Sequence, residues 1–417
     1  MYSGGRAGTR LVRPQDQLRV CVVGAGTRFL SGISYYTLHL ANALAPAHRV
    51  SVVLMRQLLP TRLYPGRRRV GAPLTCLGYA PGVPVFEGVD WYWLPSLFGA
   101  LRFLVRERPD VVTLQWWSGT VLHSYCVLAL AARLLGAQVV IEFHELLDTG
   151  EARLRLARAY VRLLAPWLVR LASGFVVHSD YDRVALSTRY KPGDRPVAVI
   201  PHGPYNQLQS FGQERPVRFA PAASCNLLFF GVIRPFKGLE DLVAAFDAIS
   251  PLEIGGYWLT IVGESWEGWT RPAELIARSR YRHRITFINR YVHDTEVAGL
   301  FAGADAVVLP YHRSSASGPL HMAMSWGLPV VVTRVGGLTE AVVGYQGAIV
   351  VAPRDRVELQ GALLELPRLA GQRFADPHSW EQTVERYHAL FDSVATGARA
   401  TPEGSAAEPN LVGGALG

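Results

Sequence analysis

Short apolar runs alternate with amphipathic stretches along both halves of the chain. The runs of the first half predict β-strands at Leu18–Gly24, Val50–Met55, Asp110–Leu114, Val139–His144, Gly174–His178 and Val197–Pro201. Those of the second half predict strands at Asn226–Phe230, Trp258–Val262, Ile285–Ile288, Ala306–Pro310, Val330–Thr333 and Ala348–Val351. Helical patterns lie between most of these strands. Strands that alternate with helices form parallel sheets, so the pattern predicts an α/β protein with two doubly wound, Rossmann-like domains.

The length of 417 residues fits two domains of ordinary size. We expect a flexible N-terminus over residues 1–17, a first domain over 18–204, a polar linker over 205–224, a second domain over 225–376, a last helix over 377–396 and a disordered tail over 397–417. Two domains joined in this way leave a cleft between them. Ligands of such sheets bind at the carboxyl ends of the strands.

Composition restricts the class of function only broadly. Lys and Arg number 42 against 33 Asp and Glu, which gives a net charge of +9. That surplus suits an anionic ligand, an anionic membrane or nucleic acid, or it serves solubility alone. The basic residues are scattered without an aromatic-interleaved stripe, so we expect no nucleic-acid partner. We also expect a cytoplasmic protein, because the chain shows no signal peptide, no membrane-spanning stretch and no metal-ligand spacing among its four cysteines.

The clearest chemical motif is Gly231–Gly238, with the sequence GVIRPFKG, which follows a predicted strand and opens a predicted helix. Gly231 lets the chain leave the strand in a tight turn. Arg234 and Lys237 then lie near a helix N-terminus, where free N–H groups already favour an anion. A guanidinium fork and an ammonium at that position suit a diphosphate. The alternative is a pair of solvated surface cations.

A second motif, Ser314–Pro329, also leads from a predicted strand into a helix. Ser317 and Gly318 would present backbone N–H groups at the start of that helix, and Gly318 would allow a phosphate or ribose to approach closely. The alternative is a purely structural helix with Ser317 as its N-cap.

Two weaker signals lie in the first half. His144 ends a predicted strand, where it could hydrogen-bond a sugar or an acceptor in the cleft, although a lone histidine is often only a satisfied buried group. Gly24–Gly32 is a glycine-rich turn after the first strand. It is no complete dinucleotide fingerprint, because Phe29 stands where the third glycine belongs, so the turn argues against NAD.

Taken in order, these motifs resemble those of the retaining family 4 glycosyltransferases of the GT-B fold, from Leu18 to about Val394. The matching segments are the donor-diphosphate turn with Gly231, Arg234, Lys237 and Gly238, the base-binding segment Phe287–Val292, the strand segment Ala302–Pro310, the signatures Gly327–Val331, Gly336, Gly337 and Glu340, and the hinge signature Val199–Gly203. Gly32 matches the family's loop glycine near the donor phosphate, and His144 its histidine at the donor sugar. Trp380 matches the aromatic residue that begins the helix returning to the first domain.

The resemblance implies transfer of a hexose from a UDP- or GDP-sugar to a glycan, lipid-linked or small-molecule acceptor. It also implies retention of configuration, with neither metal nor cofactor. The first domain would bind the acceptor and the second domain the nucleotide sugar. Catalysis would fall to His144, Arg234 and Lys237. Donor binding would fall to Gly32, Gly231, Arg290, Tyr291, Val292, Ser317, Gly318, Pro319 and Leu320.

The sequence departs from the family at two positions. The family often carries two glutamates eight positions apart, one for the donor sugar and one for its ribose. Ser314 and Met322 stand there in this chain. Neither side chain can bind a ribose diol as a carboxylate does. A noncatalytic sugar-nucleotide-binding protein of the same fold therefore stays open as an alternative.

Basic and apolar residues of the first half also predict an anionic membrane surface as a partner. Arg62 and Arg67–Arg69 lie beside leucines, and the apolar segment Trp91–Val105 is followed by further arginines. Peripheral proteins use this combination on anionic lipid, so we expect possible binding to the inner face of the membrane. The alternative is a core helix and a solvated loop.

Overall fold

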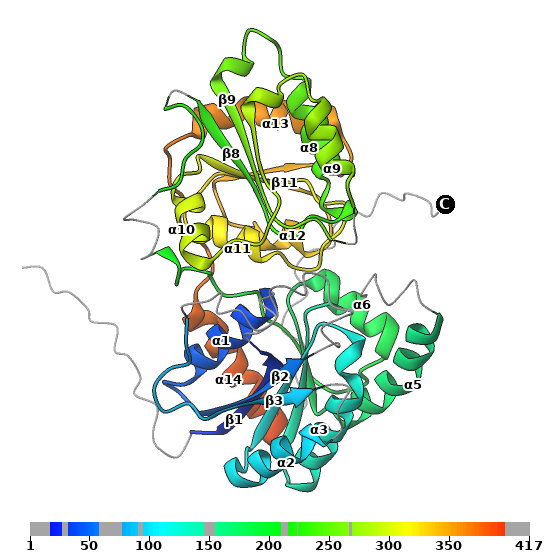
Figure 1. Ribbon diagram of the computed structural model, residues 1–417. Helices are drawn as coiled ribbons and strands as arrows, with labels where there is room; N and C mark the ends of the chain where they lie inside the picture. Colours follow the sequence, from blue (N-terminus) through cyan, green and yellow to red (C-terminus); the bar gives the residue numbers. More distant parts are fainter. Residues whose placement is uncertain are drawn as a thin grey trace, which may run out of the picture.

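The computed structural model describes residues 17–26, 32–57, 77–90, 95–145, 155–209, 216–222, 224–266 and 269–396. Within these ranges the chain forms two α/β domains, which lie one above the other in Figure 1. Each domain is built on one parallel sheet, as the alternating pattern predicts. Residues 1–16 and the tail over 397–417 lie outside the described residues.

The first domain holds a seven-stranded sheet with the order β3-β2-β1-β4-β5-β6-β7. Its strands are β1 (Arg19–Ala25), β2 (Arg49–Gln57), β3 (Val85–Asp90), β4 (Val111–Trp116), β5 (Gln138–Phe143), β6 (Gly174–Val177) and β7 (Val197–Val199). Its helices are α1 (Gly32–Leu44), α2 (Ser96–Glu107), α3 (Leu122–Leu134), which a 3-10 turn precedes, α5 (Arg155–Leu171) and α6 (Asp180–Tyr190).

The second domain holds a six-stranded sheet with the order β10-β9-β8-β11-β12-β13. Its strands are β8 (Cys225–Phe230), β9 (Tyr257–Val262), β10 (Ile285–Ile288), β11 (Ala306–Leu309), β12 (Val330–Thr333) and β13 (Ala348–Val351). Its helices are α8 (Leu239–Asp247), α9 (Arg271–Arg278), α10 (Asp294–Ala302), α11 (Gly318–Ser325), α12 (Gly337–Ala341) and α13 (Arg356–Leu369).

Successive residues of a strand point to opposite faces of the sheet, and the first domain uses both faces for packing. On β1, Val20 and Val22 pack with α1 and with the last helix, α14 (Trp380–Thr396). Cys21 and Val23 pack on the other face, where α2, α3 and α5 cover the sheet. The predicted last helix therefore completes the core of the first domain, although it follows the second domain in sequence (Figure 1).

Three expectations need correction or completion. The sequence pattern did not predict β3, which forms one edge of the first sheet. The predicted linker is not uniformly exposed, because Tyr205 and Leu208 are buried and Gln209 donates to the Ser325 carbonyl of α11. Arg62, Arg67–Arg69 and the first four residues of the apolar segment Trp91–Val105 lie outside the described residues. In the described part of the chain, no helix is long and apolar enough to span a membrane.

Candidate functional site

The order in which the chain adds strands to the second sheet reverses between β8 and β11. The chain adds β9 and β10 on one side of β8, and it adds β12 and β13 beyond β11. The turns after β8 and β11 therefore leave the sheet side by side, at the point where doubly wound sheets bind ligands. A Cβ atom at Gly231 would lie 3.3 Å from Pro319 Cγ. The fold thus brings together the two motifs that the sequence singled out in this domain.

The turn after β8 depends on its two glycines. Gly231 and Gly238 have φ angles of +122° and +66°, which favour glycine. A Cβ atom at Gly238 would lie only 1.8 Å from the carbonyl oxygen of Pro310, at the end of β11. Between the glycines, Arg234 precedes a 3-10 turn at Pro235–Lys237, and α8 follows directly. The predicted sequence of strand, turn and helix is confirmed.

Arg234 and Lys237 are half-buried on aromatic rings rather than solvated at the surface. Arg234 Cζ lies 4.4 Å from the ring centroid of Trp266, and Lys237 Nζ lies 3.6 Å from that of Tyr311. Burial lowers the pKa of Lys237, Glu145 opposes this shift and the neighbouring Arg234 and Arg313 add to it, which together bring the pKa to about 7. An anion bound beside Lys237 would favour its charged form, so the turn is built to gain from a negative ligand.

The loop after β11 enters α11 through Ser317. The Ser317 side chain accepts a hydrogen bond from the Leu320 backbone N–H at 3.4 Å, so the capping role is present. At Gly318, the first residue of the helix, no atom lies within 4 Å of the position that a Cβ atom would take. The helix N-terminus is therefore open at Gly318, beside the Gly231 turn, and its N–H groups can meet an anion there.

The two positions that lack glutamate have structural contacts. The Ser314 hydroxyl donates to the Ala316 carbonyl at 2.8 Å, and the Ser314 carbonyl accepts from the Gly337 N–H at 3.2 Å. Met322 lies within α11 and packs against the core of the second domain. Ser314 thus links the loop to α12, but neither Ser314 nor Met322 supplies a carboxylate.

The predicted base-binding segment follows β10, the edge strand of the second sheet. Val292 is buried and Tyr291 is half-buried. Arg290 is exposed and forms two hydrogen bonds to the carboxylate of Glu296, one of them 3.0 Å long. The structure therefore uses Arg290 in an ion pair on α10, and Val292 in the core.

His144 directly follows β5 and is buried. It is only 6% exposed, and its ring stands edge-on to that of Tyr36 at 4.7 Å. Burial, followed by the neighbouring His178, holds the pKa of His144 well below its usual range, so the imidazole is neutral. His144 Nε2 makes no hydrogen bond to the described residues, and its polar neighbour is Glu142 Oε1 at 3.5 Å.

A chain of hydrogen bonds fixes the tautomer of His144. His178 Nδ1 lies 2.9 Å from the Ile200 carbonyl, which can only accept, so Nδ1 carries the proton. Burial lowers the pKa of His178 to about 4, so its Nε2 is an acceptor. That atom lies 3.1 Å from His144 Nδ1, which must donate. His144 Nε2 is therefore an acceptor, ready for a hydroxyl donor.

Sequence reasoning missed the polar network around His144. Glu142, two residues earlier on β5, accepts from the Tyr387 hydroxyl of α14 at 2.6 Å. Burial raises the pKa of Glu142 to about 7. A signal was present: His144 and His178 end two predicted strands and His202 directly follows a third, and these strands are neighbours in the sheet. The carboxyl ends of adjacent parallel strands meet at one edge, so these histidines had to converge.

These three histidines form the one group of described residues that places three metal-ligating atoms within 4.8 Å of one another. Both nitrogens of His178 are already engaged, one by Ile200 and one by His144. A fourth histidine, His321 of α11, stacks on His202 with ring centroids 5.3 Å apart. The geometry is that of a hydrogen-bonded, stacked cluster that joins the two domains.

Further hydrogen bonds join the two domains. The Tyr35 hydroxyl of α1 donates to Asp294 at the start of α10. Glu340 of α12 accepts two backbone N–H bonds at the start of α6, at 2.6 and 2.9 Å. Glu145, next to His144, acts electrostatically on Lys237. The carboxyl end of β5 therefore lies near the Gly231–Gly238 turn.

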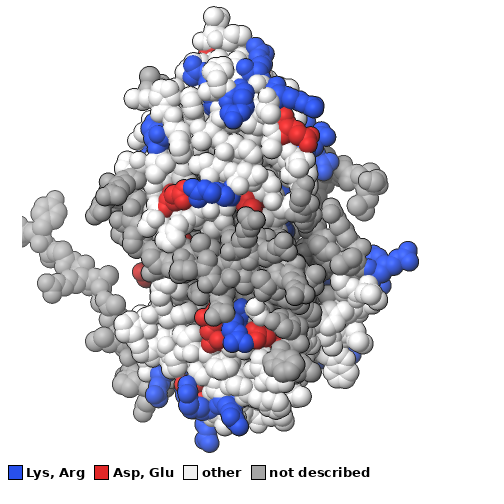
Figure 2. Space-filling model, in the orientation of Figure 1, with Lys and Arg blue, Asp and Glu red and all other residues white. Residues whose placement is uncertain are grey.

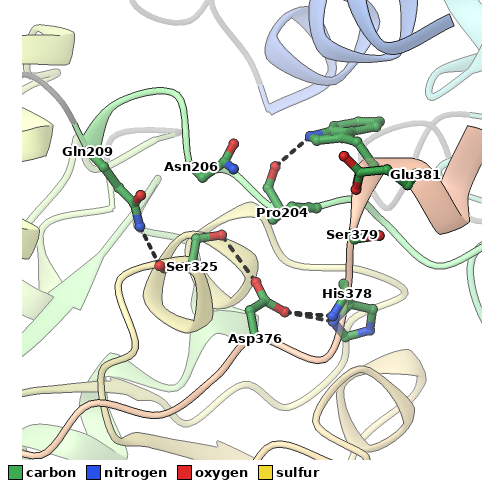
Figure 3. Close-up of a pocket in the computed structure, with 9 residues that line it drawn as sticks. Pro204, Asn206, Gln209, Ser325, Asp376, His378, Ser379 and Glu381 are labelled. Atoms are coloured by element: carbon green, nitrogen blue, oxygen red, sulfur yellow. Dashed lines mark hydrogen bonds and ion pairs between the residues drawn. The ribbon is translucent and has the colours of Figure 1, made fainter. Parts of the chain in front are cut away.

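A pocket lined by described residues lies at the hinge and not at these turns (Figure 3). It has a volume of about 240 Å³ and lies where the chain crosses between the domains. Asp376 binds the Ser325 hydroxyl at 3.2 Å and the His378 backbone N–H at 3.0 Å, and the Trp380 indole N–H donates to the Pro204 carbonyl at 2.9 Å. These bonds indicate a structural hinge.

Gly32 and the glycine-rich turn are only partly described. Gly32 begins α1, and nothing lies within 4 Å of its Cβ position. Residues 27–31 lie outside the described residues. At Gly24 and Gly26, a Cβ atom would lie within 3 Å of Thr37 and of the Met55 carbonyl respectively, so these two glycines are needed for packing.

Comparison with known proteins gives consistent matches over both domains. The family described as Glycosyltransferase Family 4 matches residues 30–204, and the family described as Glycosyl transferases group 1 matches residues 224–368. A glycogen synthase of Mycobacterium tuberculosis is 29% identical over 385 residues, which cover 85% of this chain and 89% of that protein. A D-inositol 3-phosphate glycosyltransferase of Actinosynnema mirum is 27% identical over 414 residues, with 88% and 93% covered.

Among solved structures, the catalytic domain of Starch Synthase IV from Arabidopsis thaliana, bound to ADP and acarbose, is similar with a TM-score of 0.65. The match has 12% sequence identity and covers 91% of this chain and 100% of that one. At this identity the similarity shows the fold alone, which is the two-domain GT-B architecture.

Proposed function

The chain belongs to the family 4 glycosyltransferases, and from that premise we propose that it transfers a hexose from a UDP- or GDP-sugar to a glycan, lipid-linked or small-molecule acceptor. One observation carries the donor assignment. The Gly231–Gly238 turn, with Arg234 and Lys237, lies against the open N-terminus of α11 at the switch point of the second sheet. Two cations and a helix N-terminus together suit a diphosphate.

The proposed chemistry retains the configuration at the anomeric carbon. The bond from that carbon to the diphosphate oxygen breaks, and a bond to the acceptor hydroxyl oxygen forms on the same face. The hydroxyl proton passes to the leaving phosphate. Arg234, Lys237 and the N–H groups at Gly318 would stabilise the charge that grows on the leaving group, which is the usual largest contribution to such catalysis. These protein cations support our proposal that no metal is required.

His144 stays a predicted contact to the donor sugar. Its Nε2 supports that role, because the atom is buried and makes no hydrogen bond, although Glu142 Oε1 lies 3.5 Å away. The fixed tautomer makes this atom an acceptor, so the donor sugar would present an O–H group to it. Gly32, Arg290, Tyr291 and Val292 likewise stay predicted donor contacts.

The alternative is a noncatalytic protein that binds sugar nucleotides. It is favoured by Ser314 and Met322, which supply no carboxylate for the ribose or the donor sugar. Both proposals require the diphosphate turn. They differ in turnover: a transferase releases nucleoside diphosphate from a donor, faster when an acceptor is added, whereas a binding protein releases none.

We expect UDP or GDP to raise the melting temperature in the presence of a chelator. A ligand at 100 times its dissociation constant stabilises a protein by about 2.7 kcal/mol. The measurement is a thermal melt with UDP, GDP and ADP in turn, with and without EDTA. Inorganic sulfate at equal ionic strength serves as the control for unspecific anion binding. The donor assignment fails if no nucleotide shifts the transition, and metal independence fails if EDTA abolishes the shift.

A further inference from the structure

Exposed apolar side chains of the described chain concentrate on one face of the first domain. This face is formed by α2, α3 and α5, and we call it the α2–α3–α5 face. It carries nine of the sixteen large hydrophobic residues that are exposed in the described ranges, among them Leu156, 87% exposed, and Leu134, 79% exposed. The nine are Phe98, Val105, Val127, Leu130, Leu134, Leu135, Leu156, Leu163 and Trp167.

The same face is strongly basic. Eight exposed arginines lie on the three helices or directly at their ends, and the helices contain one acidic residue, Glu107, which is paired with Arg106 at 2.7 Å. Figure 2 shows basic side chains projecting at the lower end of the first domain, where α2 lies in Figure 1, and at the edge on the side of α5. The arginines are Arg102, Arg106, Arg108, Arg133, Arg155, Arg158, Arg162 and Arg170.

Helix α5 shows how the two properties combine. Its inner side packs Ala165, Leu168 and Val169 into the core of the first domain. Its outer side exposes Leu163 and Trp167 between arginines. A helix that needed only to cover the sheet would carry polar residues on that outer side. The exposed leucines and tryptophan are therefore unexplained by the fold.

The three helices make a continuous surface. Helix α3 packs against both α2 and α5, on the side of the sheet opposite to α1 and α14. The donor turns lie in the other domain, so a role for this face does not depend on the proposed function.

We propose that the α2–α3–α5 face docks on the surface of an anionic lipid bilayer. Leucine and tryptophan side chains would enter the boundary between headgroups and acyl chains, and the arginines would meet lipid phosphates. Charge complementarity selects this occupant. A second copy of the chain, docked by the same face, would bring arginines against arginines, which is unfavourable. The proposal keeps the α2 part of the predicted membrane contact, within Trp91–Val105, and adds α3 and α5 to it. Arg62 and Arg67–Arg69, the other part of that prediction, lie outside the described residues.

The test is flotation of the full chain with vesicles of phosphatidylcholine alone or mixed equally with phosphatidylglycerol, at low and high salt. The wild type is expected to float with the anionic vesicles at low salt and to be released by salt. The variant R155Q/R158Q/R162Q should bind about 100-fold more weakly, since each basic residue near an anionic surface contributes roughly fivefold. The variant L156S/L163S/W167S should bind at least about tenfold more weakly, because it loses apolar burial.

Matched controls come from the second domain. R278Q/R280Q/R354Q removes three exposed arginines, and L252S/V357S removes two exposed apolar residues. Both should bind vesicles as the wild type does. Melting curves confirm that each variant folds. Acyl chains labelled with bromine should quench the tryptophan fluorescence of the wild type more than that of Trp167→Phe.

Three results would overturn the proposal. The first is a wild type that fails to float with anionic vesicles even at low salt. The second is a loss of binding in the control variants equal to that in the α5 variants. The third is self-association that sedimentation detects without vesicles and that L156S/L163S/W167S abolishes, because the apolar residues of the face would then bury against a second copy. Nucleotide-induced stabilisation is measured separately, so failure here leaves the donor site untouched.

Discussion

Arg234→Ala and Lys237→Ala are each expected to lower turnover by about 10²–10³-fold while the protein folds normally. Loss of one preorganised donor to a developing negative charge raises a reaction barrier by about 2.7–4 kcal/mol. Both side chains rest on aromatic rings at the switch point of the second sheet, beside the open end of α11. Their removal leaves the core intact, so the melting temperature should change little.

The measurement is the rate of nucleoside diphosphate release with donor and acceptor at saturation. Lys237→Arg keeps a charge but changes its geometry, and Arg278→Ala removes an exposed arginine elsewhere in the second domain. The first should recover part of the activity and the second should retain all of it. If Arg234→Ala and Lys237→Ala both turn over at near wild-type rate, the diphosphate binds elsewhere.

The sequence predicted most of the fold because its strands are buried on both faces. Runs such as Val50–Met55 and Val330–Thr333 each contain one polar residue, Ser51 or Thr333, and are otherwise apolar, which is typical of strands of a parallel sheet. The missed strand β3 lies at an edge, and its sequence VFEGVD contains two acidic residues and a glycine. An edge strand needs less apolar surface, so its pattern resembles that of a loop.

The candidate site was only partly predictable. The Gly231–Gly238 turn is formed by neighbouring residues. Its glycines indicate the backbone conformation, and Arg234 and Lys237 give the charge. The surroundings of His144 are not local, because Tyr387 reaches Glu142 across 245 positions of sequence. The α2–α3–α5 face could not be predicted for the same reason. In sequence, each of its helices has the pattern of a helix that packs on a sheet, and only the packing shows which leucines stay exposed. Burial is a property of the assembled fold, so the sequence alone could not show which of these residues are buried and which are exposed.

Acid is expected to destabilise the protein strongly between pH 6.5 and pH 5.5. Burial lowers the pKa of His39 to about 4, of His178 to about 4 and of His321 to about 3. It also holds the pKa of His144 and His202 well below their usual range. Unfolded histidine titrates near pH 6.5, so on acidification the unfolded chain binds protons that the folded chain refuses. The free energy of unfolding must therefore fall with pH.

Glu142 acts in the opposite direction. Burial raises its pKa to about 7, so between pH 7 and about pH 4.5 the folded state holds a proton that the unfolded chain releases. Each of the five histidines removes about 1 kcal/mol between pH 6.5 and pH 5.5, and Glu142 returns about the same amount. The net loss of about 4 kcal/mol is a large part of the 5–15 kcal/mol that stabilises a typical protein.

Urea denaturation at pH 7.5, 6.5 and 5.5 measures this loss. The midpoint should fall steeply below pH 6.5, and His202→Asn should make the fall shallower because one buried titrating group is gone. His283→Asn, at an exposed site on the second domain, serves as the matched control and should leave the pH profile unchanged. The stacked contact of His202 with His321 joins the domains, so protonation of either ring should also weaken the contact between the domains. An equal urea midpoint at pH 7.5 and pH 5.5 would contradict the prediction, because it would show that these histidines are charged or hydrated in the folded protein and not buried and neutral.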